Sequence, residues 1–589
     1  MKINRINNLN SVYYSKNNAK SEHSGSVKYE SNSNVLSHQL NSLAYANKYM
    51  TALSFKGALD SEEKNFKLNL NFDELKRRTS PDNFAAYTLI DENNDAYKKL
   101  SQGDKTALKH LVKAAKILEE VYLMQDNPHN IEFKNYLEEQ TLKGNEQARL
   151  TLQLFNAQKG INAKDIEGGS VNLARGIEPK PQRGFYPEDL TEDEFHNILI
   201  LMIKKNKISE VKKILNQRTM VERDGKYLKA TDYTDYFKEQ FVNAATELEL
   251  AALTSSNDDF NRYLILQANA LMMNNPYMDA LADKKWAKLQ DTPLEFTITR
   301  ENYEDEMTGT IVENKELSKT LEERGISPIP KDFLGGRVGI VNKKGTDALM
   351  AIKQYLPALA QNMPYNDEYE QNISTKGDAK QTMVDVDLVA VTGNVGEYRG
   401  GITLAENLPN DDKLSLKIGG GRRNVYHRQI RFISDKAKLQ ERLDAILDKE
   451  QQQYYLDEAD HWFTIGHENA HSLGPKKGGE TLGKYRNIIE ENKADMGSLA
   501  FVDLLTELGM YTPEQRKQII VTTITDNFLK SKPTLSQAHR VRTVMQNKYF
   551  AERGAYEITP EGKIHVNIDK VVPIAKEMLA EIVRIQIDG

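Results

Sequence analysis

The chain has 589 residues, of which 39% are hydrophobic and 28% are charged, with a mean hydropathy of −0.63. This length suits several domains or one large enzyme, and the composition supplies a sizeable core beneath a very polar surface. The formal net charge of −6 argues against a nucleic-acid-binding protein, which usually carries a basic patch. Because the chain has no cysteine, any metal must be bound by histidine and carboxylate side chains.

No apolar run approaches the length of a membrane span. The longest aliphatic run is "ILILMI" at 198–203, against roughly 18 residues for a span. The N-terminus lacks the apolar region of a signal peptide, so we expect a cytoplasmic protein without membrane or nucleic-acid partners. Residues 1–45 are rich in Asn, Ser and Lys without a sustained apolar period, which predicts a disordered tail.

Helical periodicity dominates residues 46–290. In "ALKHLVKAAKILEEVYLM", residues 107–124, apolar side chains recur at the 3.6-residue spacing of one helix face. We interpret this face, and the similar faces that follow it, as core-forming and without a role in chemistry.

Strand-like alternation replaces this pattern over residues 291–435. Leu294, Phe296 and Ile298 alternate with polar residues, and residues 384–388 alternate valine or leucine with aspartate. A period of two is typical of a strand that is buried on one face only. We therefore predict a mixed region with antiparallel, half-buried strands.

Helices return over residues 436–589, and glycines mark the ends of three of them. The helix that contains "TIGHENAHSLGP" should end at Gly474. The next helix should run from about 484 to 508, and a third from about 536 to 553.

The sequence "HENAH" at 467–471 places two histidines four residues apart, with a glutamate directly after the first. On a helix, His467 and His471 project from one face about one turn apart, so both imidazoles can reach a single ion. Glu468 can meet a water bound to that ion. This geometry is why H-E-x-x-H suits a zinc hydrolase, although chance places the pattern in roughly one such chain in a hundred.

The segment "IIEENKAD" at 488–495 supplies the other groups that such a site needs. Glu491 follows His471 at a spacing that allows a turn and an antiparallel helix, so it is the candidate third ligand. Asp495, one turn later, is placed to accept a hydrogen bond from the spare nitrogen of a ligand histidine, and Glu490 is assigned to the same surroundings. Two histidines and one glutamate leave a fourth position for water, as in catalytic zinc sites. The alternative is that this charged segment is only a solvated helix face.

At this point the sequence resembles a known family. "HENAHSLGP" followed by "IIEENKADMGSLAF" resembles the zinc site of the dipeptidyl peptidase III family and its bacterial relatives. Three further segments resemble family segments in the same order, over roughly 290–560: "ITRENYEDEMTG", "GITLAENLPNDD" and "SQAHRVRTVMQNKYFAERGA". The best-known members insert one residue, H-E-x-x-x-H, whereas this chain has the five-residue form.

The resemblance implies one Zn²⁺ per chain, bound by His467, His471 and Glu491. It implies a predominantly helical α+β fold with two lobes and a cleft between them: a helical lobe that bears the zinc, and a mixed lobe with antiparallel, barrel-like strands. The catalytic residues that it implies are Glu468, His539 and Tyr303. The residues that it implies for binding the α-ammonium group of a peptide are Glu301, Asn407 and Asn410.

Together these features predict a zinc-dependent peptidase that releases dipeptides from the N-terminus of short peptides. The residues by themselves predict only hydrolysis of a peptide or a similar amide, and dipeptide release is implied by the resemblance. Two alternatives remain open: a peptide-binding protein that keeps the metal without turnover, and a zinc hydrolase of a non-peptide amide. The intact Glu468 argues against the first, and a pocket for an α-amine argues against the second.

Overall fold

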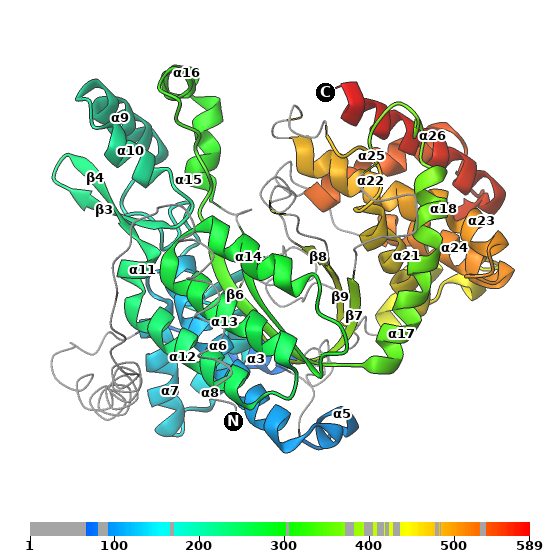
Figure 1. Ribbon diagram of the computed structural model, residues 1–589. Helices are drawn as coiled ribbons and strands as arrows, with labels where there is room; N and C mark the ends of the chain where they lie inside the picture. The colour runs from blue at the N-terminus through cyan, green and yellow to red at the C-terminus, as the bar shows by residue number, and fades with distance from the viewer. Residues whose placement is uncertain are drawn as a thin grey trace, which may run out of the picture.

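The structure is a computed structural model, and the residues that it describes are 66–79, 92–164, 170–301, 305–371, 382–393, 405–408, 418, 423–427, 436–477, 482, 485–529 and 538–588. The tail predicted at 1–45 lies outside these ranges. The chain is predominantly helical and forms two lobes, as predicted (Figure 1). Each lobe has its own hydrophobic core, one built from residues between Leu75 and Val425 and the other from residues between Leu349 and Val583.

The first lobe is organised around the long helix α6 (Gln102–Asp126), which forms where the sequence shows its apolar period. Ala107, Leu111 and Leu118 of its apolar face are fully buried, and α6 packs against both α12 and the sheet. The other elements of this lobe are α3 (Phe72–Arg78), α5 (Asp95–Lys99), α7 (Asn130–Leu142), α8 (Glu146–Gln158), β1 (Asn162–Lys164), β2 (Ser170–Asn172), α9 (Glu192–Lys204), α10 (Ile208–Ile214), β3 (Thr219–Asp224), β4 (Tyr227–Asp232), α11 (Tyr233–Tyr236), α12 (Lys238–Thr254), α13 (Asp258–Met273), α14 (Pro276–Trp286), α15 (Glu306–Gly309), η1 (Thr310–Glu313) and α16 (Lys315–Glu323).

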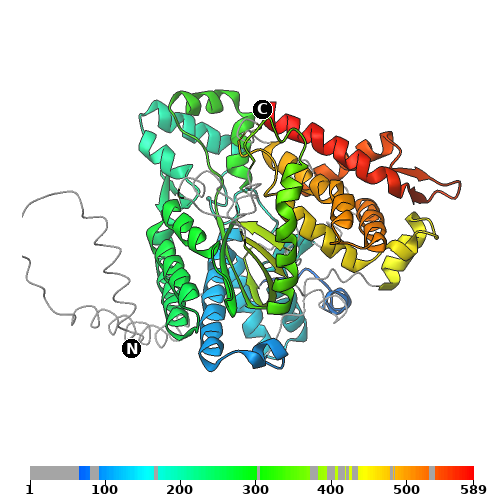
Figure 2. The ribbon, with the colours of Figure 1, turned by 45° about the vertical axis from the view of Figure 1, so that its right-hand side comes forward.

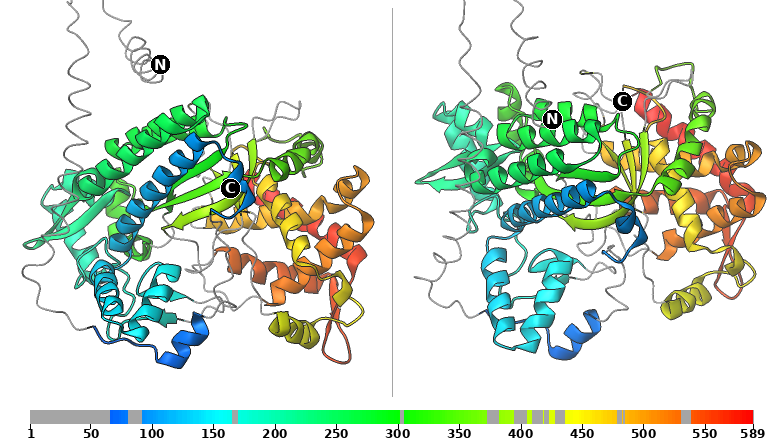
Figure 3. Two further views of the ribbon diagram at one scale, coloured as in Figure 1. Left: turned by 90° about the horizontal axis from the view of Figure 1, so that it is seen from below. Right: turned by 60° about the horizontal axis from the view of Figure 1, so that its bottom comes forward.

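A five-stranded sheet lies between the two groups of helices (Figures 2 and 3). Its order is β5 (Leu294–Glu301), β6 (Phe333–Val341), β7 (Thr382–Thr392), β9 (Arg423–His427) and β8 (Ala405–Leu408). Neighbouring strands are antiparallel except β7 and β9, which run parallel. Within the described residues β5 and β8 are edge strands, so the sheet is open and mixed where the resemblance implied a barrel-like one.

Strands β5, β6 and β7 are buried on both faces over most of their length, so the prediction of half-buried strands is wrong for them. On the apolar face α6 lies directly on the sheet, where the Thr392 hydroxyl donates a hydrogen bond to the carbonyl of Ala115 at 3.0 Å. On the other face the polar side chains bind one another: Glu295 is 3% exposed and pairs with Arg423 at 2.8 Å. The charged residues of the alternating pattern therefore contact buried partners here and do not face solvent.

The second lobe carries most of the C-terminal helices and shares the sheet with the first. Val425 of β9 packs in the first core, whereas its neighbour Tyr426 packs in the second. The helix predicted near 484–508 is two helices, with a break at Phe501. The elements of this lobe are α17 (Lys343–Met350), η2 (Ala351–Tyr355), α18 (Leu356–Gln361), α20 (Lys436–Ile446), η3 (Gln452–Tyr454), α21 (Asp457–Ala470), α22 (Arg486–Ala500), α23 (Val502–Glu507), α24 (Pro513–Leu529), α25 (Ala538–Glu552), β10 (Tyr556–Ile558), β11 (Ile564–Val566) and α26 (Ile568–Asp588).

No helix within the described ranges combines the length and the apolar character that crossing a membrane requires.

Candidate metal centre

The two helices that carry the predicted ligands pack closely against each other. α21 carries the H-E-x-x-H segment as far as Ala470, and His471 caps its C-terminal end. Gly474, with a φ of +94°, then turns the chain away. α22 returns along α21, and the hydroxyl of Ser498 donates a hydrogen bond to the carbonyl of Phe463 at 2.8 Å. A Cβ at Gly466 would lie 2.3 Å from the Ser498 Oγ atom, so this glycine allows the close approach.

Three side chains from these helices converge on one point. The Nε2 atoms of His467 and His471 are 3.1 Å apart, and the carboxylate of Glu491 lies 3.4 Å from the first and 3.9 Å from the second. One nitrogen or oxygen from each of the three lies within 4.8 Å of the others. In the described part of the chain this is the group whose geometry suits a metal ion.

The outer nitrogens of both rings are held by carboxylates. The Nδ1 atom of His467 is 2.7 Å from Asp495, and that of His471 is 3.0 Å from Glu490. Because an ionised carboxylate only accepts hydrogen bonds, each Nδ1 atom carries the hydrogen, and each Nε2 atom is left to bind either a metal or a proton. Two imidazole nitrogens and a carboxylate that converge in this way form a donor set that can bind a cation. The donor set therefore fits a bound metal.

The electrostatic environment of the site also favours a cation. Burial disfavours a charge on His467, but hydrogen bonds to Asp495 and Glu491 more than offset it and raise the pKa of the ring to about 10. Burial acts to raise the pKa of Glu490, but the charge of Lys493 and the hydrogen bond to His471 hold that pKa well below its ordinary value. The surroundings thus stabilise positive charge between the two imidazoles.

A third helix completes the surroundings of the site. Arg542 of α25 lies with its Nη1 atom 3.0 Å from Glu491 and its Nε atom 2.9 Å from Asp495. Gln546, one turn later, donates a hydrogen bond to Asp495 at 2.8 Å. The sequence reasoning missed both residues, although they lie in the same segment as the predicted His539.

The other predicted residues are placed as follows. Glu468 lies between the two histidines on α21 and is buried. Glu301 is at the end of β5 in the first lobe, where it pairs with Arg337 of β6 at 3.3 Å. Asn407 lies on β8 opposite Asn424, and His539 lies in the first turn of α25; the side chains of Asn407 and His539 are outside the described structure. Tyr303 and Asn410 also lie outside the described residues.

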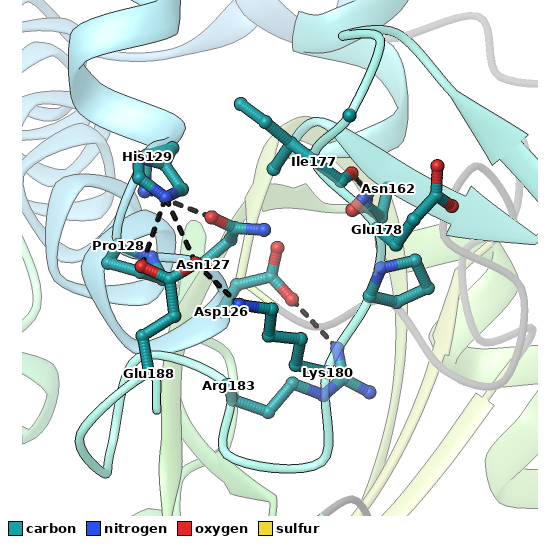
Figure 4. A pocket seen from close by; sticks show the side chains of 12 residues that line it. Asp126, Asn127, Pro128, His129, Asn162, Ile177, Glu178, Lys180, Arg183 and Glu188 are labelled. Carbon is teal, nitrogen blue, oxygen red and sulfur yellow. Dashed lines mark hydrogen bonds and ion pairs between the residues drawn. The ribbon is translucent and has the colours of Figure 1, made fainter. Parts of the chain in front are cut away.

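A separate polar pocket lies in the first lobe, at the end of α6 (Figure 4). Two ion-pair groups line it: Asp126 pairs with Arg183 at 2.9 Å, and Glu188 pairs with both Lys180 and His129. None of the predicted site residues lines this pocket. It is therefore distinct from the metal centre.

Two solved structures that share this architecture are of dipeptidyl peptidases III. A dipeptidyl peptidase III from Caldithrix abyssi is 25% identical to this chain, with a TM-score of 0.67 over 85% of this chain and 90% of that one. The enzyme of the same name from Corallococcus sp. strain EGB is 21% identical, with a TM-score of 0.66 over 87% of this chain and 89% of that one. At its lower sequence identity, the second structure shows a shared fold alone.

A curated relative carries a different name. The protein named Nudix hydrolase 3 from Arabidopsis thaliana is 24% identical over an alignment of 550 residues, gaps included, that covers 83% of this chain and 66% of that protein. The chain thus spans slightly less than two thirds of the length of this relative. No protein-family model matches the chain.

Proposed function

Because the chain belongs to the dipeptidyl peptidase III family, we propose that it is a zinc-dependent peptidase that releases dipeptides from the N-terminus of short peptides. One observation carries the zinc part of this proposal. The Nε2 atoms of His467 and His471 converge with the carboxylate of Glu491, and no thiolate is available to make the site a structural one. Two histidines and one glutamate are the ligands of catalytic zinc sites that keep one position for water.

Zinc bound by these three residues would supply a Lewis acid that lowers the pKa of water to about 7 and polarises the scissile carbonyl. Glu468 takes the proton of the attacking water and passes it to the leaving amine. His539 and Tyr303 donate hydrogen bonds to the oxyanion that develops on the carbonyl.

The substrate-binding part of the proposal concerns the other lobe. Glu301, with the amide oxygens of Asn407 and Asn410, binds the α-ammonium group of the peptide. The pairing of Glu301 with Arg337 supports this assignment, because the ion pair fixes the position of the carboxylate. Anchoring the free N-terminus at a fixed distance from the metal centre restricts cleavage to one position.

The experiment compares wild type with Glu468→Gln for zinc content and for hydrolysis of a short peptide. We expect both proteins to bind one zinc, because Glu468 is not a ligand. Turnover of the variant should fall by about 100- to 10,000-fold, which is the usual contribution of a general base. Unchanged turnover in the variant would refute the mechanism. A zinc-loaded wild type without turnover would favour the peptide-binding alternative.

A further inference from the structure

Glu490 is the centre of a network that joins three helices. Its Oε1 atom lies 3.0 Å from the Nδ1 atom of His471 on the α21 side and 2.8 Å from the Nζ atom of Lys493 on α22. Its Oε2 atom accepts a hydrogen bond at 3.0 Å from Gln586 of the C-terminal helix α26. Helix α26 runs beside α22 at the edge of the second lobe (Figures 1 and 2). Both oxygens of the carboxylate are therefore fixed.

Lys493 makes a second set of contacts at the end of α21. Its Nζ atom donates a hydrogen bond to the carbonyl of Leu473 at 2.8 Å and lies 3.4 Å from the carbonyl of His471. Carbonyls at a helix C-terminus lack partners within the helix and attract positive charge. The side chain of Lys493 is only 4% exposed, so the ammonium is enclosed by these acceptors and Glu490. One ammonium thus contacts both the backbone of His471 and the carboxylate that binds its ring.

We propose that Lys493 and Gln586 are positioning residues for His471, which they hold in its metal-facing orientation through Glu490. The proposal rests on the metal site described under the proposed function. Without these two partners the carboxylate of Glu490 could rotate, and the ring of His471, which is hydrogen-bonded to it, would turn with it. With Lys493 on one oxygen and Gln586 on the other, the carboxylate has a single orientation, and the Nε2 atom of His471 points at Glu491 and His467.

A purely structural role for these two residues predicts a different result. If Lys493 only neutralises a buried acid, its removal lowers the stability of the metal-free protein and leaves the metal affinity of the folded protein unchanged. If it positions His471, the affinity for the metal falls. Loss of an outer partner of a metal-binding histidine typically lowers metal affinity by about 10- to 100-fold.

The experiment measures the affinity for Zn²⁺ by competition with a chromogenic chelator, in wild type, Lys493→Met and Gln586→Met. We expect a loss of about 10- to 100-fold for Lys493→Met and a smaller loss, about tenfold or less, for Gln586→Met. Lys476→Met is the matched control, because this lysine lies just beyond the same helix end and pairs with Glu370 on the surface. Its Zn²⁺ affinity should equal that of wild type.

A double variant tests whether the effect passes through Glu490. In a Glu490→Gln background, Lys493→Met should cause little additional loss, because the pair acts as a unit. Equal affinities of wild type and both single variants overturn the proposal, and so does a full additional loss in the Glu490→Gln background. If Lys493→Met does not fold, the Zn²⁺ affinity of Gln586→Met tests the proposal, because this substitution leaves no charge unpaired. A wild type that binds no zinc would instead refute the proposed function, and this inference with it.

Discussion

Gly497 of α22 faces Ala470 of α21 so closely that a Cβ atom at position 497 would lie 2.7 Å from the Cβ atom of Ala470. Side-chain carbons do not approach one another to this distance, so a larger residue at this position must push the helices apart. These are the two helices whose separation sets the distance between Glu491 and the histidines. The geometry of the metal centre therefore depends on a residue without a side chain.

We predict that Gly497→Ala lowers both stability and metal affinity. Overpacking of this kind typically costs about 1–3 kcal/mol of unfolding free energy. Thermal unfolding of the metal-free protein and Zn²⁺ competition measure the two effects. Gly309→Ala is the control, because a Cβ there would meet no atom within 4 Å. Wild-type zinc affinity in Gly497→Ala would show that helix separation does not set the site.

Asp495 is expected to control metal affinity without being a ligand. It binds the Nδ1 atom of His467 at 2.7 Å, and Asp495→Asn removes the charge that stabilises the Nδ1–H form of this ring. We expect a loss of zinc affinity of about 10- to 100-fold, measured by chelator competition.

A second histidine–aspartate pair in the same lobe supplies the control for that experiment. Asp448 binds the Nδ1 atom of His565 at 2.6 Å, away from the metal centre, so Asp448→Asn repeats the chemical change outside the site. If the two variants lose equal affinity, the effect of Asp495→Asn is not specific to the site.

Glu301 is expected to distinguish free from blocked peptide N-termini. Glu301→Gln removes the negative charge that would bind the α-ammonium group, and a hydrogen bond to a charged group contributes about 1.5–3 kcal/mol. The kcat/KM value for peptides with a free N-terminus should therefore fall by about tenfold or more. Hydrolysis of N-acetylated peptides should be unaffected.

The nearby exposed Glu306 supplies the control variant Glu306→Gln, which should resemble wild type with both kinds of peptide. An equal decrease for free and acetylated peptides in Glu301→Gln would refute the assignment of the α-amine pocket.

His196 makes the attachment of α9 to the segment before α16 dependent on pH. Its Nδ1 atom accepts a hydrogen bond from Asn314 at 3.3 Å, and its Nε2 atom lies 3.1 Å from the Thr310 hydroxyl, an arrangement that requires the neutral ring. Burial lowers the pKa of His196, against the opposing charges of Asp193, Glu192 and Glu313. The unfolded segment therefore binds a proton more readily than the folded one, so this attachment is complete above about pH 6.5 and weakens as the pH falls.

Hydrogen exchange of α9 and α16 tests this dependence. Protection, corrected for intrinsic exchange rates, should be lower at about pH 5.5 than at about pH 7.5 in wild type. His196→Gln, which cannot gain a charge, should show the same protection at both values. Helix α13 serves as an internal reference in each protein. A variant with the same pH dependence as wild type would exclude His196 as its origin.

Much of the fold could be predicted from local sequence patterns. The apolar period of 107–124 gave the core face of α6, and the glycines at 474 and 554 lie where helices end with a positive φ. The alternation in residues 384–388 correctly predicted the strand β7. It wrongly predicted that one face of this strand is exposed, because Asp385 and Asp387 are buried on the second face of the sheet. A period of two shows that two faces differ, but it does not show what covers the polar face.

The candidate site could also be predicted only in part from the sequence. His467, His471 and Glu491 share two helices with short spacings, so their convergence could be predicted from the helical repeat. Gln586 lies 96 positions after Glu490, and only the packing of α26 beside α22 brings them together. Pairing between segments so far apart leaves no local pattern in the sequence.

The most direct test of the central claim is mass spectrometry of the products formed from short peptides of known sequence. The zinc-loaded wild type is compared with Glu468→Gln under the same conditions. The account predicts that wild type alone releases dipeptides from the N-terminus. Internal cleavage that requires Glu468 would contradict the α-amine pocket, and no cleavage by zinc-loaded wild type would contradict the peptidase itself.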